Sequence, residues 1–263
     1  MALIRGRPQQ AGYATVVGPG EPGIQYIGFG LLDLGDGESW EHSFPGREAV
    51  LVVLGGRCDV EAGGESWAGI GRRSDVFDGR PTAVYLPPGE RLTVRGRGAV
   101  EIAVCLAPAE RGPKAALIGP EEVRVREVGR DTFRREIHDV AAIGTLDCAR
   151  LLVGETYNPP GLWSSYPPHK HDVQSPPEES KLEEVYHFRV QPPQGFGLQR
   201  IYGDGFDEAY PIQDRDTVTI PRGYHPLAAA PGYRLYYLWI LAGEERVMQP
   251  RDDEAHVWVH GKT

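Results

Sequence analysis

The sequence has few sulfur-containing residues and lacks a long apolar run. Only 3 Cys and 2 Met occur among 263 residues, and Cys58, Cys105 and Cys148 lie far apart in an odd number that predicts no disulfide framework. No run approaches the ~20 apolar residues that cross a bilayer as a helix. The first residues also lack the apolar core of a secretory signal. We therefore expect a protein of the reducing cytoplasm without a membrane partner.

Clustered basic residues are also lacking. Lys and Arg together number 28 against 37 Asp and Glu, which gives a formal net charge of −9. Nucleic-acid-binding domains usually gather Lys and Arg on one face or along one helix, whereas here they are dispersed. No helix-turn-helix pattern is evident. The composition therefore argues against a nucleic-acid partner.

Glycine and proline are abundant, at 34 and 23 residues, and they separate short runs of Val, Ile, Leu and Tyr. This distribution favours strands joined by turns over helices, and we expect an all-β protein. Candidate strand regions in the first half are 49–62, which contains a Gly-Gly turn, 82–96 and 99–107. Those in the second half are 149–158, 182–190, 196–205, 216–226 and 233–243.

The two halves share a short repeat. "VYLPPGE" (84–90) and "VTIPRGYH" (218–225) each read as a strand that ends in a Pro-x-Gly turn. The first copy continues with Glu90, whereas the second offers His225. We therefore expect two similar barrels, and we expect the first to hold no metal.

The segment 107–122 is rich in Pro, Gly and Ala and has no strand period, so it is the best candidate for a linker. It predicts a first barrel over residues 1–112 and a second over residues 113–263.

Three histidines form a candidate metal site in the second half. In an extended strand alternate side chains face the same way, so His169 and His171 can present two imidazoles to one point while Lys170 faces elsewhere. His225 follows the turn at Pro221-Arg222-Gly223 and supplies a third imidazole. Imidazole is a common metal ligand.

Two adjacent glutamates stand in an apolar strand. Glu184 shares a face with Tyr186 and Phe188, while Glu183 shares the opposite face with His187. The aromatic face is the better barrel lining, which predicts that Glu184 points inward and Glu183 points to solvent. Three His and one Glu form a set suited to zinc, iron, manganese or nickel. We expect structural roles for the other histidines, His42, His138, His187, His256 and His260.

The order of these ligands resembles that of the cupin superfamily, whose two motifs supply three His and one Glu to a metal. Two spacings differ from the usual cupin pattern. The stretch 172–183 separates His171 from Glu184 where three or four residues are usual, and only Tyr224 precedes His225 after the glycine. We expect the longer stretch to overhang the mouth of the site.

A closer resemblance covers nearly the whole second half. The blocks 153–172, 182–190, 195–205 and 220–243 are similar to those of the 5-deoxy-glucuronate isomerases of myo-inositol catabolism. The resemblance implies two cupin barrels of the jelly-roll type, a bicupin, with a degenerate first barrel. It implies one divalent metal ion and a small-molecule uronate substrate. The oligomeric state stays open, a homo-oligomer included.

The implied reaction interconverts 5-deoxy-D-glucuronate and 5-dehydro-2-deoxy-D-gluconate, an aldose-ketose isomerisation. It requires removal of a proton beside a carbonyl, and thus a base within hydrogen-bond reach. A divalent metal would act there as a Lewis acid. The candidates for proton transfer are Glu184, Tyr186 and Tyr236. The candidates for binding the substrate carboxylate are Arg200, which shares a strand face with Leu198 and Tyr202, and then Lys170 and Arg222.

Two other functions fit the same ligands. Three His and one Glu also hold iron in cupin dioxygenases, so an iron-dependent dioxygenase is one alternative. A sugar-binding or sensory cupin without enzymatic activity is the other. Oxygen consumption separates the first alternative from an isomerase, and turnover of a uronate separates the second.

Overall fold

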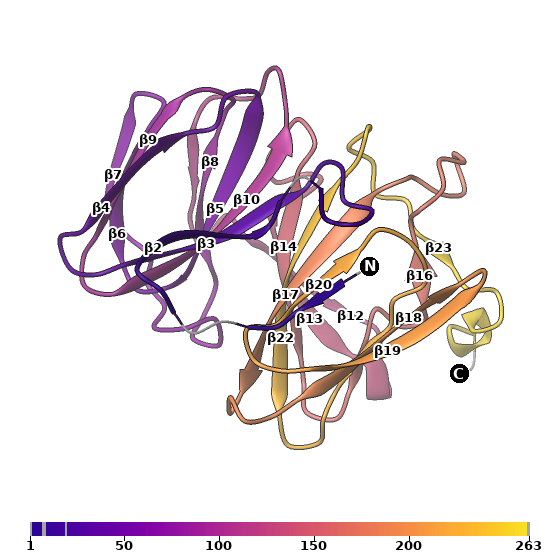
Figure 1. Cartoon of the computed structure of the whole chain (residues 1–263). Helices are drawn as coiled ribbons and strands as arrows, with labels where there is room; N and C mark the ends of the chain where they lie inside the picture. Colours follow the sequence, from indigo (N-terminus) through magenta and orange to yellow (C-terminus); the bar gives the residue numbers. More distant parts are fainter. Residues whose placement is uncertain (1, 7–8, 19, 262–263) are drawn as a thin grey trace.

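The chain folds into two all-β units, which lie side by side in Figure 1 with the first half in indigo and magenta. The computed structural model describes residues 2–6, 9–18 and 20–261. Within these residues the regular elements are strands and two short 3-10 turns, η1 (Asp131–Phe133) and η2 (Val257–Val259). The all-β prediction is confirmed. No helix in the described part of the chain is long and apolar enough to cross a membrane.

The first unit consists of two antiparallel sheets. The large sheet has the strand order β11-β8-β5-β10-β3-β2, and the small sheet has the order β4-β9-β6-β7. The strands are β2 (Gly12–Val17), β3 (Gly28–Leu34), β4 (Ser39–Ser43), β5 (Arg47–Gly55), β6 (Cys58–Ala62), β7 (Glu65–Ile70), β8 (Thr82–Leu86), β9 (Arg91–Gly96), β10 (Val100–Pro108) and β11 (Ala116–Ile118).

The second unit repeats this plan with three sheets. Their orders are β1-β20-β17-β22-β14-β13-β12, β15-β21-β18-β19 and β16-β23. The strands are β1 (Ala2–Ile4), β12 (Arg124–Val128), β13 (Arg135–Ala141), β14 (Leu152–Asn158), β15 (Trp163–Ser164), β16 (His169–Lys170), β17 (Glu183–Gln191), β18 (Gly197–Gly203), β19 (Phe206–Ile212), β20 (Thr217–Ile220), β21 (Leu227–Ala229), β22 (Arg234–Ala242) and β23 (Arg251–Asp252).

The division of the chain differs in two respects from the boundary expected at residue 112. β11 follows that boundary but pairs with β8, so it belongs to the large sheet of the first unit. β1, at the other end of the first half, pairs with β20 and completes the seven-stranded sheet of the second unit. The boundary between the sheets of the two units thus lies between Ile118 and Arg124. The first strand, β1, is the exception, because it belongs to a sheet of the second unit.

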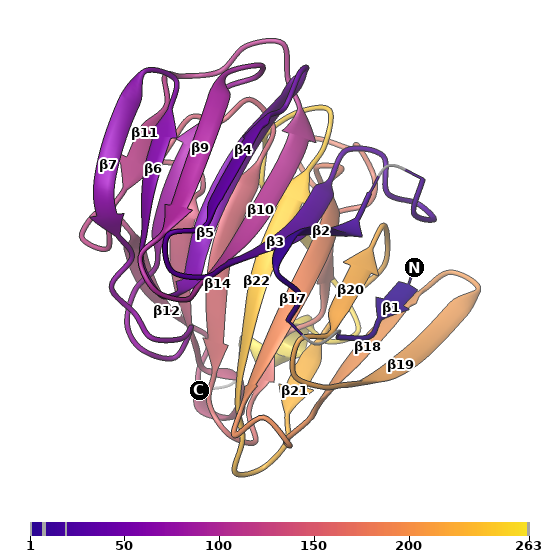
Figure 2. The ribbon, with the colours of Figure 1, turned by 60° about the vertical axis from the view of Figure 1, so that its left-hand side comes forward.

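The two large sheets pack against each other, and Figure 2 shows β5, β10 and β3 running alongside β14, β22 and β17. One hydrophobic cluster fills the first unit, a second fills the other unit, and a third contains buried residues of both large sheets. Sheets stacked in this way bury both faces of the inner layers. Of the nine residues of β17, eight are accordingly buried.

Strand pairing defines which residues of the two units are equivalent. Leu86 and Ile220 each precede the Pro-x-Gly turn, and they pair with Ala49 and Glu184 respectively. Alanine therefore stands in the first unit where the second has a carboxylate. Counted from the turn glycine, Arg91 and not Glu90 stands at the position of His225.

Two buried glutamates join the units in opposite directions. Glu48 of β5 accepts hydrogen bonds from the backbone N–H groups of residues 149–151, which precede β14, at 2.7, 2.7 and 2.9 Å. Glu183 of β17 accepts hydrogen bonds from residues 25–27, which precede β3, at 2.7, 2.6 and 2.6 Å. Charge-assisted bonds of this kind offset the cost of burying a carboxylate.

A buried ion pair lies at the same interface. Arg73 of the first unit donates to both carboxylate oxygens of Glu155 in β14, at 2.6 and 3.0 Å, and the two side chains are 1% and 0% exposed. The hydroxyls of Tyr157 and Tyr236 donate to the same carboxylate, each at 2.8 Å. A buried pair is tolerated when further hydrogen bonds satisfy both partners.

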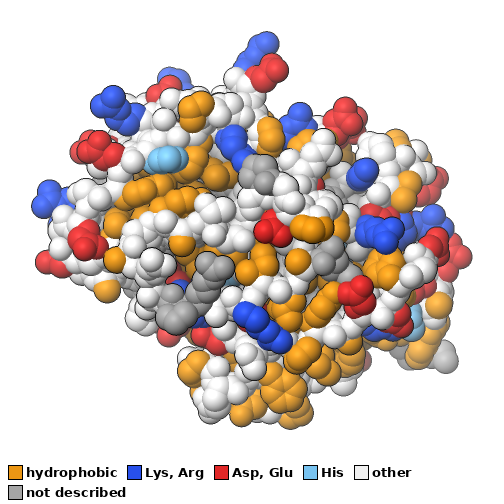
Figure 3. All heavy atoms as spheres, in the orientation of Figure 1, with side chains coloured by type: hydrophobic (Ala, Val, Ile, Leu, Met, Phe, Trp, Pro, Cys, Tyr) orange, Lys and Arg blue, Asp and Glu red, His pale blue; other side chains and the backbone are white. Residues whose placement is uncertain are grey.

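The face shown in Figure 3 carries Lys and Arg side chains interspersed with Asp and Glu. A phosphate backbone is attracted by positive potential concentrated on one face or along one stripe. The mixed charges of this face do not produce such a concentration.

We expect that removal of the Glu48 carboxylate lowers the stability of the protein without altering any residue of the histidine site in the second unit. Replacement of Glu48 by Ala removes four hydrogen bonds to its carboxylate, three from backbone N–H groups and one from the hydroxyl of Tyr85, and leaves these donors without that acceptor, which costs about 3 kcal/mol or more. We expect a melting temperature several degrees lower, measured by calorimetry. Glu41→Ala, at an exposed position of β4, is the matched control, and equal melting temperatures for both variants would contradict the structural role of Glu48.

Candidate metal site and adjoining cavity

Three histidines from two separate segments converge inside the second unit. His169 belongs to β16, His171 directly follows that strand, and His225 lies between β20 and β21. One ligand nitrogen from each ring lies within 4.8 Å of those of the other two. Within residues 2–6, 9–18 and 20–261, these three histidines are the group of His, Cys, Asp or Glu side chains close enough together to hold a metal ion.

Glu184 of β17 completes this cluster. Its Oε2 atom lies 3.2 Å from Nε2 of His171 and 3.3 Å from Nε2 of His225. Tyr186 and Phe188 lie in the hydrophobic cluster that fills the second unit. The face of β17 predicted to line the barrel is therefore confirmed. That these four residues bind a metal stays a prediction.

Backbone carbonyls orient two of the imidazoles. Nδ1 of His171 lies 2.8 Å from the carbonyl oxygen of Leu182, and Nδ1 of His225 lies 2.9 Å from that of Gly223. Donation from Nδ1 leaves the lone pair on Nε2, the tautomer that binds a metal through Nε2. Nε2 of His225 is buried and has no hydrogen-bond partner in the described chain.

The segment carrying His169 and His171 is tied to the turn that precedes His225. Gly223 has a φ of +92°, which favours glycine, and its N–H donates to Oδ2 of Asp172 at 2.7 Å. Gln199 of β18 donates from Nε2 to the carbonyl oxygen of His225 at 2.7 Å. These bonds fix the relative positions of the two sequence motifs.

The donor set fits a divalent metal. Burial lowers the pKa of His225 to about 3 and also lowers the pKa of His169, so both rings are neutral near pH 7, whereas the hydrogen bond to Glu184 raises the pKa of His171. Neutral imidazoles with one carboxylate are the ligands that zinc and other first-row divalent ions accept. Nε2 of His225 supports the same conclusion: Oε2 of Glu184 lies 3.3 Å away but makes no hydrogen bond with it, and a buried nitrogen without a hydrogen bond is costly.

A cavity of about 530 Å³ adjoins the cluster. His169 and Glu184 form part of its wall, and the sheet strands β12, β13, β14, β17 and β22 form most of the rest. Its further lining residues include Arg124, Arg126, Arg135, Asp139, Thr156, Ser165, Tyr186, Tyr237, Trp239, Met248 and Pro250. A volume of this size accommodates a small sugar acid.

The prediction that Glu183 points to solvent is wrong. Glu183 is 8% exposed, and its carboxylate accepts the N–H groups of residues 25–27 of the first unit. The face of β17 opposite the site is covered by the large sheet of the first unit. Because successive side chains of a strand point to opposite faces, the residue before Glu184 points into the interface between the units and not to solvent. Glu183 still lies outside the histidine cluster.

Tyr236 does not lie on the wall of the site. Its hydroxyl donates to Glu155, and its ring packs in the cluster between the two large sheets, near Phe77 and Tyr157. The neighbouring Tyr237 faces the cavity instead, and its hydroxyl is 2.6 Å from Oγ of Ser164. The sequence does not indicate which of these two tyrosines faces the cavity, because both faces of β22 are buried and apolar residues occupy both.

Tyr186 does line the cavity, as proposed for a residue that assists proton transfer. Its hydroxyl lies 3.2 Å from Oγ of Ser165, and its ring centroid lies 6.0 Å from that of His225. Its catalytic role stays a prediction.

The three cations proposed for the substrate carboxylate lie elsewhere. Arg200 is on the exposed face of β18, where its guanidinium donates to both carboxylate oxygens of Asp207 at 2.8 Å. Lys170 bonds Asp172 and Glu179. Arg222 is exposed and stacks on Phe206, with Cζ 4.6 Å from the ring centroid. None of the three is among the residues that line the cavity.

The stretch 172–183 does not cover the cavity as expected. Its ends meet, since the N–H of Leu182 donates to the carbonyl of His171 at 2.8 Å. None of residues 172–183 is among the residues that line the cavity, whereas Met248 and Pro250 are. The longer spacing between His171 and Glu184 is thus a loop whose ends are joined, and Nε2 of His171 still lies 3.2 Å from Oε2 of Glu184.

The other histidines have local partners. Nε2 of His187 accepts from Arg189 at 2.6 Å, and Nδ1 lies 2.9 Å from the hydroxyl of Thr217. Each of the remaining histidines lies next to an aromatic ring or a carboxylate: His42 next to Trp40, His138 next to Glu136, His256 next to Asp253 and His260 next to Asp252.

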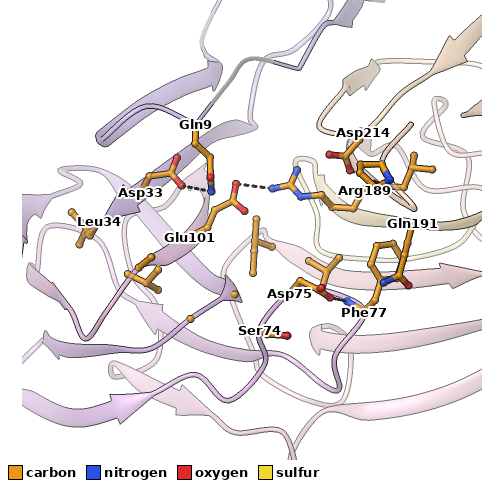
Figure 4. A pocket seen from close by; sticks show the side chains of 18 of the residues that line it. Gln9, Asp33, Leu34, Ser74, Asp75, Phe77, Glu101, Arg189, Gln191 and Asp214 are labelled. Carbon is orange, nitrogen blue, oxygen red and sulfur yellow. Dashed lines mark hydrogen bonds and ion pairs between the residues drawn. The ribbon is translucent and has the colours of Figure 1, made fainter. Parts of the chain in front are cut away.

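A second cavity, of about 770 Å³, is lined by residues of both units, and Figure 4 shows its side chains. Its charges are largely paired with each other. Glu101 accepts from Arg189 and Arg215, both at 2.6 Å, and Gln9 donates to Asp33 at 3.1 Å. With no histidine among its described lining residues, this cavity is a weaker candidate for metal-dependent chemistry.

Comparisons with known proteins agree with this geometry. The family model described as "KduI/IolB family" matches residues 3–259. The 5-deoxy-glucuronate isomerase of Geobacillus thermodenitrificans is 40% identical over 255 residues, which is 96% of this chain and 93% of that protein. The protein of the same name from Listeria monocytogenes is 34% identical and aligns over 92% of this chain and 90% of its own.

Solved structures agree as well. The crystal structure of an IolB-like protein from Salmonella typhimurium LT2 superposes with a TM-score of 0.94 at 36% identity, over 99% of this chain and 100% of that one. An oxalate decarboxylase from Lactobacillus farciminis superposes with a TM-score of 0.64 at 11% identity, over 99% and 88%. The latter likeness concerns the fold alone, and it supports the two-barrel cupin architecture.

The convergence of the four side chains predicts which replacements remove a metal. Single Ala replacements of His169, His171, Glu184 or His225 should each lose most of the metal that the wild-type chain binds, measured by elemental analysis after dialysis. Glu183→Gln is the matched control, because Glu183 is adjacent in sequence but lies at the interface between units. Full metal content in the His171→Ala protein would overturn the ligand assignment.

Proposed function

Because the chain belongs to the KduI/IolB family, we propose that its second barrel contains the active site of an aldose-ketose isomerase acting on a 5-deoxy-hexuronate. The activity is that of the 5-deoxy-glucuronate isomerases, which interconvert 5-deoxy-D-glucuronate and 5-dehydro-2-deoxy-D-gluconate. The family implies a place in inositol catabolism. The convergence of three histidines and Glu184 beside a cavity of about 530 Å³ is the observation that supports this site most strongly.

The proposed metal ligands are His169, His171, Glu184 and His225. A divalent ion bound there supplies a Lewis acid that polarises the carbonyl and an adjacent hydroxyl, with no redox change required. Zinc, manganese, iron and nickel all accept this donor set. The equivalent positions of the first barrel hold Ala49 and Arg91, and we propose that this barrel binds no metal.

The chain's own residues shape the remainder of the site. The isomerisation moves a proton from C2 to C1 and requires a base near both carbons. The carboxylates on the cavity wall are Glu184 and Asp139, and both oxygens of Asp139 accept hydrogen bonds from Arg126 at 2.7 and 2.9 Å. Glu184 is therefore the proposed proton carrier, acting in addition to its role as a ligand.

Tyr186 is the proposed hydrogen-bond donor to a substrate oxygen. Its hydroxyl lies on the cavity wall beside that of Ser165. A donor held by packing stabilises negative charge on oxygen as the proton leaves C2. Apolar and aromatic neighbours such as Trp239 and Leu241 line the same cavity, and they limit the access of water.

The cysteines support a proposal about the location of the protein inside the cell. Cys58, Cys105 and Cys148 are all buried as free thiols, which agrees with a reducing cytoplasm. The competing dioxygenase and sugar-binding functions are disfavoured by the names of the relatives.

The reaction itself provides a direct test. In deuterated water the enzyme should place deuterium on the product carbon that was the aldehyde carbon, C1, of the substrate, because a base that exchanges with solvent returns a solvent-derived proton. Turnover should require metal and consume no oxygen, measured by NMR and an oxygen electrode. Oxygen uptake in step with substrate loss would favour the dioxygenase, and metal-loaded protein that binds but does not convert uronates would favour the sugar-binding function.

Tyr186 of β17 and Tyr236 of β22 provide a test of which face of the sheet lines the site. Tyr186→Phe should reduce kcat by about 10-fold to 100-fold with little change in melting temperature or metal content, because one hydrogen bond to the reacting oxygen is lost. Tyr236→Phe should instead lower the melting temperature and spare kcat, since its hydroxyl bonds Glu155 at the interface. The reverse pattern would refute the assignment of the two faces.

A further inference from the structure

We propose that Arg135 binds the carboxylate of the uronate substrate, an inference that rests on the isomerase function proposed above. Arg135 is the first residue of β13 and is 8% exposed. It lines the 530 Å³ cavity together with His169, Glu184 and Tyr186. A buried cation thus shares one cavity with two of the four proposed metal ligands.

One edge of the Arg135 guanidinium is free. Nη1 donates to the backbone carbonyls of Phe133 and Tyr166, at 3.2 and 3.3 Å. Nε is buried and has no hydrogen-bond partner in the described chain, and no bond from Nη2 to a described residue is present. The N–H groups of Nε and Nη2 lie on the same edge of the planar group. That edge matches the two oxygens of a carboxylate.

Two other arginines of this chain use that edge to hold a carboxylate. Arg126 donates from Nε and Nη2 to Asp139, at 2.7 and 2.9 Å, and Arg200 donates from the same atoms to Asp207, both at 2.8 Å. Among the described residues, no carboxylate lies within 4.0 Å of the Arg135 guanidinium. A buried cation without a counter-ion is costly, so its edge is suited to an anion that arrives from outside.

The other cations on the cavity wall are less suited to this role. Arg126 is already neutralised by Asp139. Arg124 is exposed at the start of β12, where water weakens an ion pair. Arg135 combines burial, a free edge and a place on the cavity wall.

The chemistry of the substrate agrees with this arrangement. In 5-deoxy-glucuronate the carboxylate is C6, whereas the proton moves between C1 and C2, so the binding group and the reacting group are at opposite ends of the chain. Binding energy gained at a remote group positions the reacting carbons. A neutral sugar would leave Arg135 buried and unpaired, which gives discrimination in favour of uronates.

The test compares the acid with its neutral methyl ester. For wild-type enzyme and Arg135→Gln, kcat/KM is measured for 5-deoxy-glucuronate and for its methyl ester, with metal content and melting temperature recorded. The ratio of the two kcat/KM values should fall by about 100-fold in Arg135→Gln, because the charge-assisted pair is lost only for the acid. The loss should appear in kcat as well as in KM, because the pair also positions the reacting carbons.

Arg124→Gln is the matched control, and its ratio should stay within about threefold of the wild-type ratio, as expected for an exposed cation. If Arg135→Gln does not fold, Arg135→Lys replaces it, and the ratio should fall by about tenfold because the charge remains but the two-pronged geometry is lost.

An unchanged ratio in a folded, metal-loaded Arg135 variant would overturn the inference, and so would a large fall in Arg124→Gln alone. Failure of the wild-type enzyme to convert the acid would instead defeat the proposed function, so the two failures are distinguishable.

Discussion

The seven-stranded sheet of the second unit is buried on both faces, and most features of the molecule depend on this constraint. One face packs on the large sheet of the first unit, and the other face forms the wall of the cavity. Successive residues of a strand point to opposite faces, so neighbours in sequence belong to different environments. Glu183 and Tyr236 make hydrogen bonds at the interface between the two units, whereas their sequence neighbours Glu184 and Tyr237 face the site.

The same constraint explains how far the sequence could predict the structure. The all-β fold and the convergence of the two histidine motifs with a glutamate follow from glycine and proline spacing, strand alternation and a repeated turn. The environment of Glu183 could not be predicted, because alternation distinguishes two faces but does not reveal that a second sheet covers the outer one. The expectation that Arg200 faces the substrate fails for a related reason. The face of β18 that carries Arg200 is exposed, whereas the buried side chains are Gln199 and Ile201. Arg135 lies in a segment, 124–141, whose alternating charged and apolar residues read equally well as a solvated surface.

Buried charges show how the first barrel supports the second. Glu48, Glu155 and Glu183 are each buried, and each receives several hydrogen bonds that cross between the units or come from Arg73. These satisfied groups hold the inner sheets in register without providing any reactive atom. Nε of Arg135 and Nε2 of His225 differ from them, because both atoms are buried and make no hydrogen bond with a described residue. Incomplete hydrogen bonding in an otherwise satisfied interior is what distinguishes the site from the rest of the core.

The most direct test of the account is a crystal structure of the metal-loaded protein with a non-reactive uronate analogue, with data collected at the absorption edge of the metal. The account predicts one anomalous peak per chain, at about 2.0–2.2 Å from Nε2 of His171 and of His225, with no peak in the first barrel. It also predicts that the analogue's carboxylate accepts from Nε and Nη2 of Arg135. A metal peak away from this cluster, or a carboxylate bound at another cation, would contradict it.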